Sequence, residues 1–399
     1  VAGDHPYGML PTALRNLSIV DWQVRAGIAG LMAGLGAASV VWFRRRLWRW
    51  LTRALCVPLA VVFVGAAINA HFGYFPTLGA LLGRTAADQV SSATFLQLEH
   101  HHPRGHLALG VQSLASTKWS NGMPEHGVVV KFVMPGTVSH FSPRTGQVYL
   151  PPIWFRWPRP KLPVIELLHG SPGSPDDWTR GGRADLTADA YAAAHDGFAP
   201  VLVMPDVNGV SWWHDSECVD GPMGNAETYL TVDVRNAVSR TFGTRRDGAA
   251  WAVAGLSEGG SCALQMGLRH PDLFGAVGDF SGDDHPWVSG GLRKLFWGST
   301  LSQLQQSERA YDPRALLASW HGTDHPAIYF AAGRSDSTFP KMQRLLAQAR
   351  GDGLPARIDP ISGGHTFYLW QVCFENSLPW IMSYLDAPRP LVHHHVVHV

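Results

Sequence analysis

Hydrophobic residues form two long uninterrupted runs near the start of the chain. Residues 26–43 carry no charged side chain, and residues 54–75 carry none apart from the titratable His71. A helix needs about 20 mostly apolar residues to cross a bilayer, so both runs are long enough. The pattern therefore predicts a transmembrane helical hairpin within residues 1–75, with helices at about 26–43 and 54–75. Gly30 and Gly34 form a small-xxx-small face that is expected to pack these helices together.

The segment between the two runs is strongly basic. Residues 44–53 hold five arginines and two tryptophans. Short loops rich in Lys and Arg stay in the cytoplasm, and Trp favours the membrane interface. We therefore expect this loop to be cytoplasmic and everything after residue 75 to lie outside the cytoplasm. A cleaved signal peptide followed by a buried helix is the alternative, but it fits an arginine-rich loop poorly.

Further along, the pattern changes to short apolar runs that alternate with helical periodicity. This alternation predicts an α/β domain with a mostly parallel sheet flanked by helices on both faces. The domain is expected over residues 126–388, after a linker at 76–125 with little periodicity and before a His-rich tail at 389–399. The expected strands are residues 128–134, 147–150, 164–168, 201–204, 250–254, 327–331 and 356–358.

A helix is expected directly before the strand at 250–254. Its apolar positions recur at helical spacing, so one face is predicted to pack on the sheet. These positions are Ala226, Tyr229, Leu230, Val234, Ala237, Val238 and Phe242.

Composition narrows the class of partner. The 32 basic and 31 acidic residues nearly cancel, which argues against a nucleic-acid partner. The four cysteines show no C-x-x-C spacing, which argues against a zinc or thioredoxin-type site. Histidine-rich tracts at residues 99–106 and 393–398 resemble metal-binding segments, but no carboxylate or cysteine lies at ligand spacing. We therefore expect solvated loops there and no metal.

The strand at 250–254 runs into Gly255-Leu-Ser257-Glu-Gly259, followed by a helical pattern from Ser261. This is the G-x-S-x-G nucleophile elbow of α/β-hydrolases, in which a tight strand-to-helix turn exposes the serine. Glycines are needed two residues to either side because the turn leaves no room for side chains. Ser257 is therefore predicted to be the nucleophile.

A serine hydroxyl needs a histidine to take its proton and a carboxylate to orient that histidine. In this fold the chain order is serine, acid, histidine. His365 follows the last predicted strand on a glycine-rich loop, and Asp336 follows the strand at 327–331. Asp283 and Asp284 are rivals for the acid, whereas Asp324 lies at the wrong end of its strand.

The developing oxyanion also needs donors. The loop after the third predicted strand reads His169-Gly-Ser171. We expect the backbone N–H groups of Ser171 and Glu258 to form the oxyanion hole. His169 is expected to shape the loop rather than take part directly.

The domain resembles the esterase D group of α/β-hydrolases, which includes S-formylglutathione hydrolases and secreted mycobacterial mycolyltransferases. The resemblance runs from about Gly146 to Leu385 and rests on six motifs. They are Val148-Tyr-Leu-Pro-Pro, Pro163-Val-Ile-Glu-Leu-Leu-His-Gly, Asp176-Asp-Trp, Gly255-Leu-Ser-Glu-Gly-Gly, His270-Pro-Asp-Leu-Phe-Gly-Ala-Val-Gly-Asp-Phe-Ser-Gly and Gly363-Gly-His-Thr-Phe-Tyr-Leu-Trp370. It implies serine ester hydrolysis or acyl transfer with no metal or organic cofactor. The mycolyltransferase relatives are secreted without a membrane hairpin, so the N-terminus departs from their pattern.

Glu258 stands where those relatives commonly have an apolar residue. A carboxylate beside the nucleophile would attract a cationic substrate group, but a surface glutamate at a helix start, favoured by the helix dipole, is the simpler expectation. Asp215 and Glu217 follow the fourth strand and are also candidate substrate-binding residues. The cysteines nearest the elbow, Cys218 and Cys262, form a plausible disulfide on an extracytoplasmic domain.

Aromatic residues add a possible groove for lipid tails. Trp213 and Trp370 are candidate substrate-binding residues, and Trp212, Trp287 and Trp297 are further members of such a groove.

The sequence thus predicts a multi-pass, membrane-anchored serine esterase with an extracytoplasmic catalytic domain. A tether at the bilayer favours a lipid or cell-envelope ester as substrate, and aminoacyl-phosphatidylglycerol is attractive because its ammonium suits the acidic residues. Acyl transfer onto a sugar, as in the mycolyltransferases, is the alternative. A non-catalytic membrane protein that uses a hydrolase-like domain for binding is the further alternative.

Overall fold

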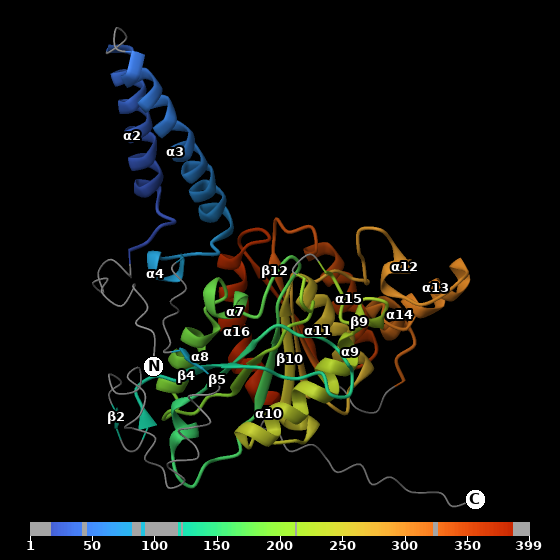
Figure 1. Ribbon diagram of the computed structural model, residues 1–399. Coiled ribbons are helices and arrows are strands. Elements are labelled where there is room, and N and C mark those ends of the chain that lie inside the picture. Colours follow the sequence, from blue (N-terminus) through green and yellow to red (C-terminus); the bar gives the residue numbers. More distant parts are fainter. Residues whose placement is uncertain are drawn as a thin grey trace, which may run out of the picture. The chain divides into compact units, whose positions relative to one another are not determined.

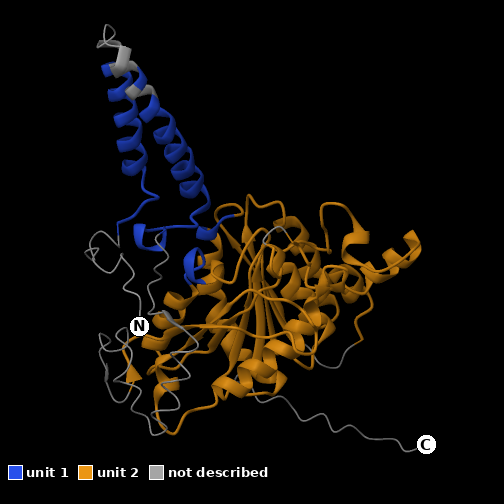
Figure 2. Cartoon of the chain, viewed as in Figure 1, with its two compact units in different colours: residues 1–86, 179–183, 366–368 blue, residues 87–178, 184–365, 369–399 orange. Residues whose placement is uncertain are grey.

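The computed structural model describes residues 17–41, 46–81, 89–91, 119–120, 123–211, 214–321 and 326–385. Both histidine-rich tracts lie outside these residues, as do Trp212, Trp213 and Asp324. The chain divides into two compact units (Figure 2). The smaller comprises residues 1–86, 179–183 and 366–368, and the larger comprises residues 87–178, 184–365 and 369–399.

Two long helices dominate the smaller unit. They are α2 (Trp22–Val41) and α3 (Arg46–Phe72), and the one-turn helix α4 (Leu78–Leu81) follows them. In the described part of the chain, one stretch, Ala54–Phe72, is long and apolar enough to cross a membrane by length and composition. The prediction of a second spanning helix still rests on the sequence pattern.

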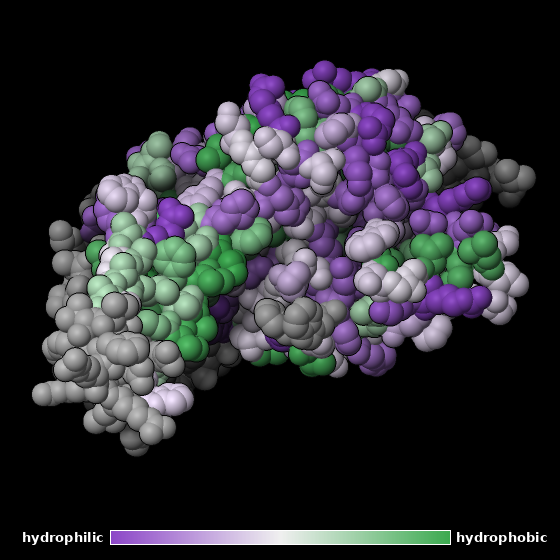
Figure 3. Space-filling model, turned by 90° about the horizontal axis from the view of Figure 1, so that it is seen from above, coloured by the Kyte–Doolittle hydropathy of each residue, from purple (hydrophilic) through white to green (hydrophobic). Residues whose placement is uncertain are grey.

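Apolar side chains of these helices are exposed. Leu31, Val57 and Val61 are examples, and Figure 3 shows hydrophobic residues gathered on the surface of this unit. The predicted packing through Gly30 and Gly34 is wrong, because a Cβ at either position would meet no atom within 4 Å. The two helices therefore do not approach closely at these glycines.

A mixed sheet forms the centre of the larger unit. In the described residues it has nine strands. They are, in spatial order, β1 (Gln89–Ser91), β4 (Val128–Phe132), β5 (Gly146–Leu150), β7 (Val201–Met204), β6 (Val164–Leu168), β10 (Trp251–Leu256), β11 (Ala276–Phe280), β12 (Ala327–Gly333) and β13 (Ala356–Ile361). β5 runs antiparallel to both of its neighbours, and every other neighbouring pair is parallel. The predicted α/β-hydrolase architecture is confirmed.

The central strands are mostly apolar because both faces of the sheet are covered, and the buried Glu166 of β6 and Asp279 of β11 are exceptions. All residues of β6, β7, β10, β11 and β12 are buried. Figure 1 shows α8 and α16 on one side of the sheet and α10 and α11 on the other. The helices of this unit are α7 (Asp177–Arg180), α8 (Ala184–Ala193), α9 (Ala226–Thr228), α10 (Arg235–Phe242), α11 (Glu258–Arg269), α12 (Leu292–Leu295), α13 (Leu301–Arg309), α14 (Pro313–Ala318), α15 (Phe339–Gly351) and α16 (Phe367–Leu385). Parts of α7 and α16 belong to the smaller unit.

Short elements complete the larger unit. Two ribbons, β2 (Trp119–Ser120) with β3 (Met123–Pro124) and β8 (Asp220–Gly221) with β9 (Gly224–Asn225), are antiparallel. The 3₁₀ turns are η3 (Pro152–Phe155) and η5 (Gly248–Ala250).

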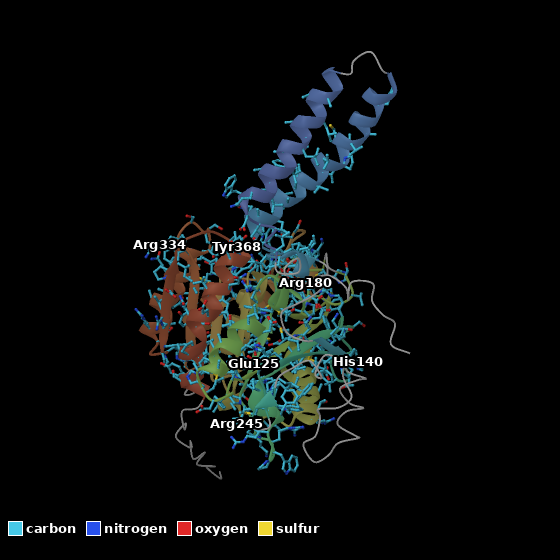
Figure 4. All side chains as sticks on the ribbon, turned by 90° about the vertical axis from the view of Figure 1, so that its left-hand side faces the viewer. Glu125, His140, Arg180, Arg245, Arg334 and Tyr368 are labelled. Carbon is cyan, nitrogen blue, oxygen red and sulfur yellow. A yellow bond between two sulfur atoms is a disulfide. The ribbon has the colours of Figure 1, made fainter. Side chains whose placement is uncertain are left out.

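Strand register brings the ends of the parallel strands together. Gly255 of β10 pairs with Leu168, the last residue of β6, and Leu256 pairs with Phe280, the last residue of β11. The loops that follow these strands therefore leave the sheet side by side. Arg334, directly after β12, and Arg245, before β10, lie at opposite ends of the sheet (Figure 4).

The helix predicted over residues 226–242 is not regular. A π-helix, η4 (Tyr229–Val234), separates α9 from α10. The apolar positions named above are buried except for the partly buried Ala237. The predicted burial is thus confirmed, but the wider turn also buries Asp233, whose carboxylate accepts from the backbone N–H groups of Val138 and Ser139 at 2.9 Å.

Candidate active site

Ser257 stands on the predicted turn between β10 and α11. Its backbone is left-handed, with φ 56° and ψ −124°, a strained conformation that typically marks functional sites. A Cβ on Gly255 would lie 1.9 Å from the carbonyl oxygen of Gly259, and a Cβ on Gly259 would lie 2.2 Å from that of Leu168. Any side chain at these two positions would push the turn open, which explains the glycines of the motif.

The structure brings Ser257, His365 and Asp336 together in one chain of contacts. The Nε2 atom of His365 lies 2.9 Å from the hydroxyl oxygen of Ser257, and its Nδ1 atom lies 2.9 Å from Oδ2 of Asp336. An ionised carboxylate only accepts, so Nδ1 carries the proton and donates to Asp336. In the neutral imidazole, Nε2 is then free to accept the serine proton.

Asp336 is held as a carboxylate. Burial opposes its ionisation, but hydrogen bonds from His365 and from the backbone N–H of Thr338 outweigh this effect and lower the pKa of Asp336. The Thr338 hydroxyl donates to the same oxygen, Oδ1, at 3.0 Å. The two rival acids have other partners: Asp283 binds Lys341, and Asp284 binds His285.

The predicted oxyanion loop lies directly beside the nucleophile. A Cβ added to Gly170 would lie 3.0 Å from the Cβ of Ser257. His169 is fully buried, and its Nδ1 lies 2.8 Å from the carbonyl oxygen of Gly170, to which it donates. Because the N–H and C=O of a trans peptide point in opposite directions, the Ser171 N–H points away from that imidazole.

Two residues that the sequence analysis missed hold this loop. Asp206 is fully buried, and its Oδ1 lies 3.1 Å from Nε2 of His169. Arg144 donates to Asp206 through Nε and Nη2, and to the carbonyl oxygen of Gly173 through Nη1 at 2.9 Å. Burial opposes ionisation, but these hydrogen bonds lower the pKa of Asp206 to about 2. Asp206 lies two residues after β7, at the carboxyl edge of the sheet. This position could have marked it as a candidate site residue from the sequence.

The second predicted donor, the N–H of Glu258, belongs to the first residue of α11. N–H groups in the first turn of a helix have no acceptor within the helix and stabilise negative charge. Ser171, on the loop after β6, and Glu258, at the start of α11, thus carry backbone donors on either side of Ser257. Their role as oxyanion donors stays a prediction.

The side chain of Glu258 is not on the surface, contrary to our simpler expectation. It is 7% exposed, and its carboxylate accepts from Asn208 Nδ2 at 2.8 Å and from the Glu217 backbone N–H at 3.3 Å. The Asp215 carboxyl interacts with the side chains of both Glu258 and Ser171. The structure therefore gathers the three candidate acidic residues at the oxyanion loop.

A disulfide fixes this acidic loop to the nucleophile helix. Cys218 and Cys262, 44 residues apart, are bonded, with their Cα atoms 5.5 Å from each other. Glu217 and Cys218 have left-handed backbones with φ of 47° and 52°. The predicted pairing is present, and Cys56 and Cys373 are free.

The candidate tryptophans have different environments. Trp370 is buried and packs edge-on against the His365 ring, with centroids 4.8 Å apart, so it supports the base. Trp287 and Trp297 are 62% and 71% exposed. The placement of Trp213 is outside the described residues.

In the described residues, one group of side chains has metal-ligand geometry: Asp283, Asp284 and His285. Lys341 already contacts both oxygens of Asp283 at 2.7 and 2.8 Å, and Arg344 lies 3.5 Å from Asp284. These cations supply the positive charge that a metal ion would otherwise bring.

Comparison with known proteins agrees with this geometry. The family model described as putative esterase matches residues 140–381. An uncharacterized protein from Corynebacterium glutamicum is 32% identical over 366 residues, covering 88% of this chain and 80% of its own.

Several solved structures share the fold. A ferulic acid esterase has a TM-score of 0.54 at 21% identity, covering 65% of this chain and 98% of its own. The fluorophosphonate-binding serine hydrolase F of Staphylococcus aureus has a TM-score of 0.53 at 18% identity, covering 64% and 98%. An S-formylglutathione hydrolase from Agrobacterium tumefaciens has a TM-score of 0.53 at 18% identity, covering 68% and 98%.

Proposed function

The chain belongs to the esterase family and is an ester-hydrolysing enzyme, and we propose that it is a serine esterase with Ser257 as nucleophile, His365 as base and Asp336 as orienting acid. The observation that carries this proposal is the continuous hydrogen-bonded chain from Asp336 through His365 to Ser257. The completeness of this chain argues against a non-catalytic binding module.

The reaction proceeds in two steps. The Ser257 oxygen attacks the ester carbonyl carbon while His365 Nε2 takes its proton, and the Ser171 and Glu258 N–H groups stabilise the oxyanion. The imidazolium then protonates the departing alcohol, which leaves an acyl-serine. Water, activated by the same imidazole, releases the acid and restores Ser257.

A fluorophosphonate probe tests the nucleophile. The wild-type protein should be labelled, and Ser257→Ala should not. Ser302→Ala is a matched control, because Ser302 is exposed on α13 and its loss should leave labelling intact. A folded wild-type protein that resists the probe would overturn the proposal.

We further propose that the enzyme is anchored in the cell membrane by two helices with its catalytic domain outside the cytoplasm. The apolar helix Ala54–Phe72 and the five arginines within residues 44–53 support this topology. Reporter fusions placed after residue 75 test it: a periplasmic or surface reporter should be active there, and a cytoplasmic one should not.

Such a tether favours a lipid or cell-envelope ester as the substrate. Aminoacyl-phosphatidylglycerol is our specific candidate, supported by Asp215, Glu217 and Glu258 beside the nucleophile. Incubation with envelope lipids should then yield the lipid and a free amino acid. A new acylated sugar would instead indicate acyl transfer.

A further inference from the structure

Asp215 lies near the side chains of the two residues whose backbones are the proposed oxyanion donors. Its carboxyl interacts with the Ser171 hydroxyl and with the Glu258 carboxyl. Glu217 joins them, since its backbone N–H donates to Oε1 of Glu258. Three carboxyl groups thus lie together at the side chains of the two proposed oxyanion donors.

This arrangement is unfavourable for catalysis on an uncharged ester. Like charges at close range repel, and a partly buried site screens this repulsion less than bulk water does. The polar groups that stabilise the three carboxyls in the described chain are neutral: the Asn208 amide, the Ser171 hydroxyl and backbone N–H groups of Glu217 and Trp287. The nearby Asp283 faces Glu217 and adds negative charge, although Lys341 pairs with it.

The cluster also has unused acceptors. Oε2 of Glu217, a residue that is only 6% exposed, and Oδ1 of Asp215 are buried without a hydrogen-bond partner. A buried acceptor that is left unpaired destabilises the protein, because it has lost its hydrogen bonds to water and gained none in return. These two oxygens come from the loop that the Cys218–Cys262 disulfide fixes to α11.

The three groups share too few positive partners to ionise together. Burial raises the pKa of Asp215, and burial together with neighbouring carboxylates raises those of Glu217 and Glu258 well above their ordinary values. Burial and the neighbouring carboxylates therefore favour the protonated form of these groups when no cation is bound.

We propose that Asp215, Glu217 and Glu258 form a subsite for the α-ammonium group of an aminoacyl ester, and that efficient hydrolysis depends on this positive charge in the substrate. The ammonium offers three donors, which satisfy the unpaired oxygens, and its charge takes the place of a proton on these groups. The ammonium nitrogen is two bonds from the ester carbonyl carbon. An ammonium bound by these carboxyls therefore places the ester carbonyl beside the proposed oxyanion hole. The inference rests on the proposed serine esterase function and specifies its substrate class.

A matched pair of substrates tests this dependence. Alanine 4-nitrophenyl ester and propanoic acid 4-nitrophenyl ester differ only by the amine, and the released nitrophenol reports both reactions. With the full-length protein in detergent at pH 6.5, we expect kcat/KM to favour the alanyl ester by about 10- to 100-fold, the range for hydrogen bonds to charged groups of about 1.5–3 kcal/mol. Ser257→Ala supplies the background of spontaneous hydrolysis.

The variant D215N/E217Q removes two of the negative charges and should abolish most of the preference by slowing the alanyl ester and accelerating the propanoyl ester. Glu217→Gln alone is the fallback if the double variant does not fold, and a smaller shift in the same direction is expected. Asp352→Asn, at the exposed end of α15, is the charge control and should keep the wild-type preference.

Two results would overturn the inference: equal hydrolysis of both esters by the wild-type enzyme, or a folded carboxyl variant that keeps the full preference. Fluorophosphonate labelling of Ser257 tests the esterase proposal separately. Labelling without a preference for the charged ester would rule out the ammonium subsite and still support the serine esterase.

Discussion

Nδ1 of His365 lies 2.9 Å from Oδ2 of Asp336, although the two residues are 29 positions apart and follow different strands. The loops after β12 and β13 meet because these strands are parallel neighbours. The carboxylate selects the imidazole tautomer that leaves Nε2 facing Ser257. In the proposed mechanism, Asp336 therefore acts through His365 rather than on the substrate.

Replacing Asp336 with Asn should lower kcat severely. The amide no longer requires Nδ1 to be protonated, so the tautomer that can accept the serine proton is lost, an effect of about 10,000-fold in a comparable triad. Steady-state kinetics with a 4-nitrophenyl ester and a thermal melt measure activity and folding together. Asp283→Asn is the matched control, and a larger loss there than in Asp336→Asn would assign the acid to Asp283.

Replacing His169 tests whether it orients the Ser171 peptide. Removing its donor to the Gly170 carbonyl in His169→Ala should reduce kcat by about 100-fold, as loss of an oxyanion donor does, with a smaller effect on KM. In His169→Asn the amide nitrogen can take the place of Nδ1, so this variant should recover part of kcat. Equal losses in both variants would indicate that the imidazole serves only to fill space.

Glu166 on β6 should make stability depend on pH. It is fully buried with neither carboxyl oxygen hydrogen-bonded, and burial raises its pKa from 4.5 to about 8. Between these two values the folded state binds a proton that the unfolded chain has released, so this group's contribution to the free energy of unfolding falls as pH rises. Glu166→Gln removes that dependence.

Thermal melts of both proteins from pH 5 to 8 check this expectation. The Tm of the variant should rise relative to that of the wild type as pH rises. At pH 8 the corresponding gain in the free energy of unfolding should be on the order of a few kcal/mol. Asp279, whose pKa burial also raises to about 8, is present in both proteins and cancels in the comparison. Parallel curves for the two proteins would show that Glu166 is not the responsible group.

The disulfide should stabilise the fold and hold the acidic loop in place. Opening a bridge between residues 44 positions apart typically costs about 2–4 kcal/mol. Cys218→Ser with Cys262→Ser should therefore lower the unfolding midpoint in urea. Cys373→Ser, which removes a buried free thiol, is the control, and an unchanged midpoint in the double variant would contradict the expectation.

The triad was predictable because its residues occupy positions that local rules define. The elbow needs two glycines around one serine, and the acid and base follow successive strand ends in a set order. Strand positions were likewise predicted from short apolar runs, since buried parallel strands are apolar on both faces. The sequence did not predict the roles of Asp206 and Arg144, because the contacts that define these roles join residues 37 and 62 positions apart.

The sequence by itself determined the hydrolase class of this chain and the order of the proposed triad, Ser257, Asp336 and His365, because these residues belong to short motifs with fixed local geometry. Only the tertiary structure decided that Glu258 is buried, that Asp215 and Glu217 lie against it, and that a π-helix interrupts residues 226–242. The difference has a physical origin. A turn is constrained by its own few residues, whereas the burial and charge state of a carboxyl depend on which distant loops strand register brings beside it.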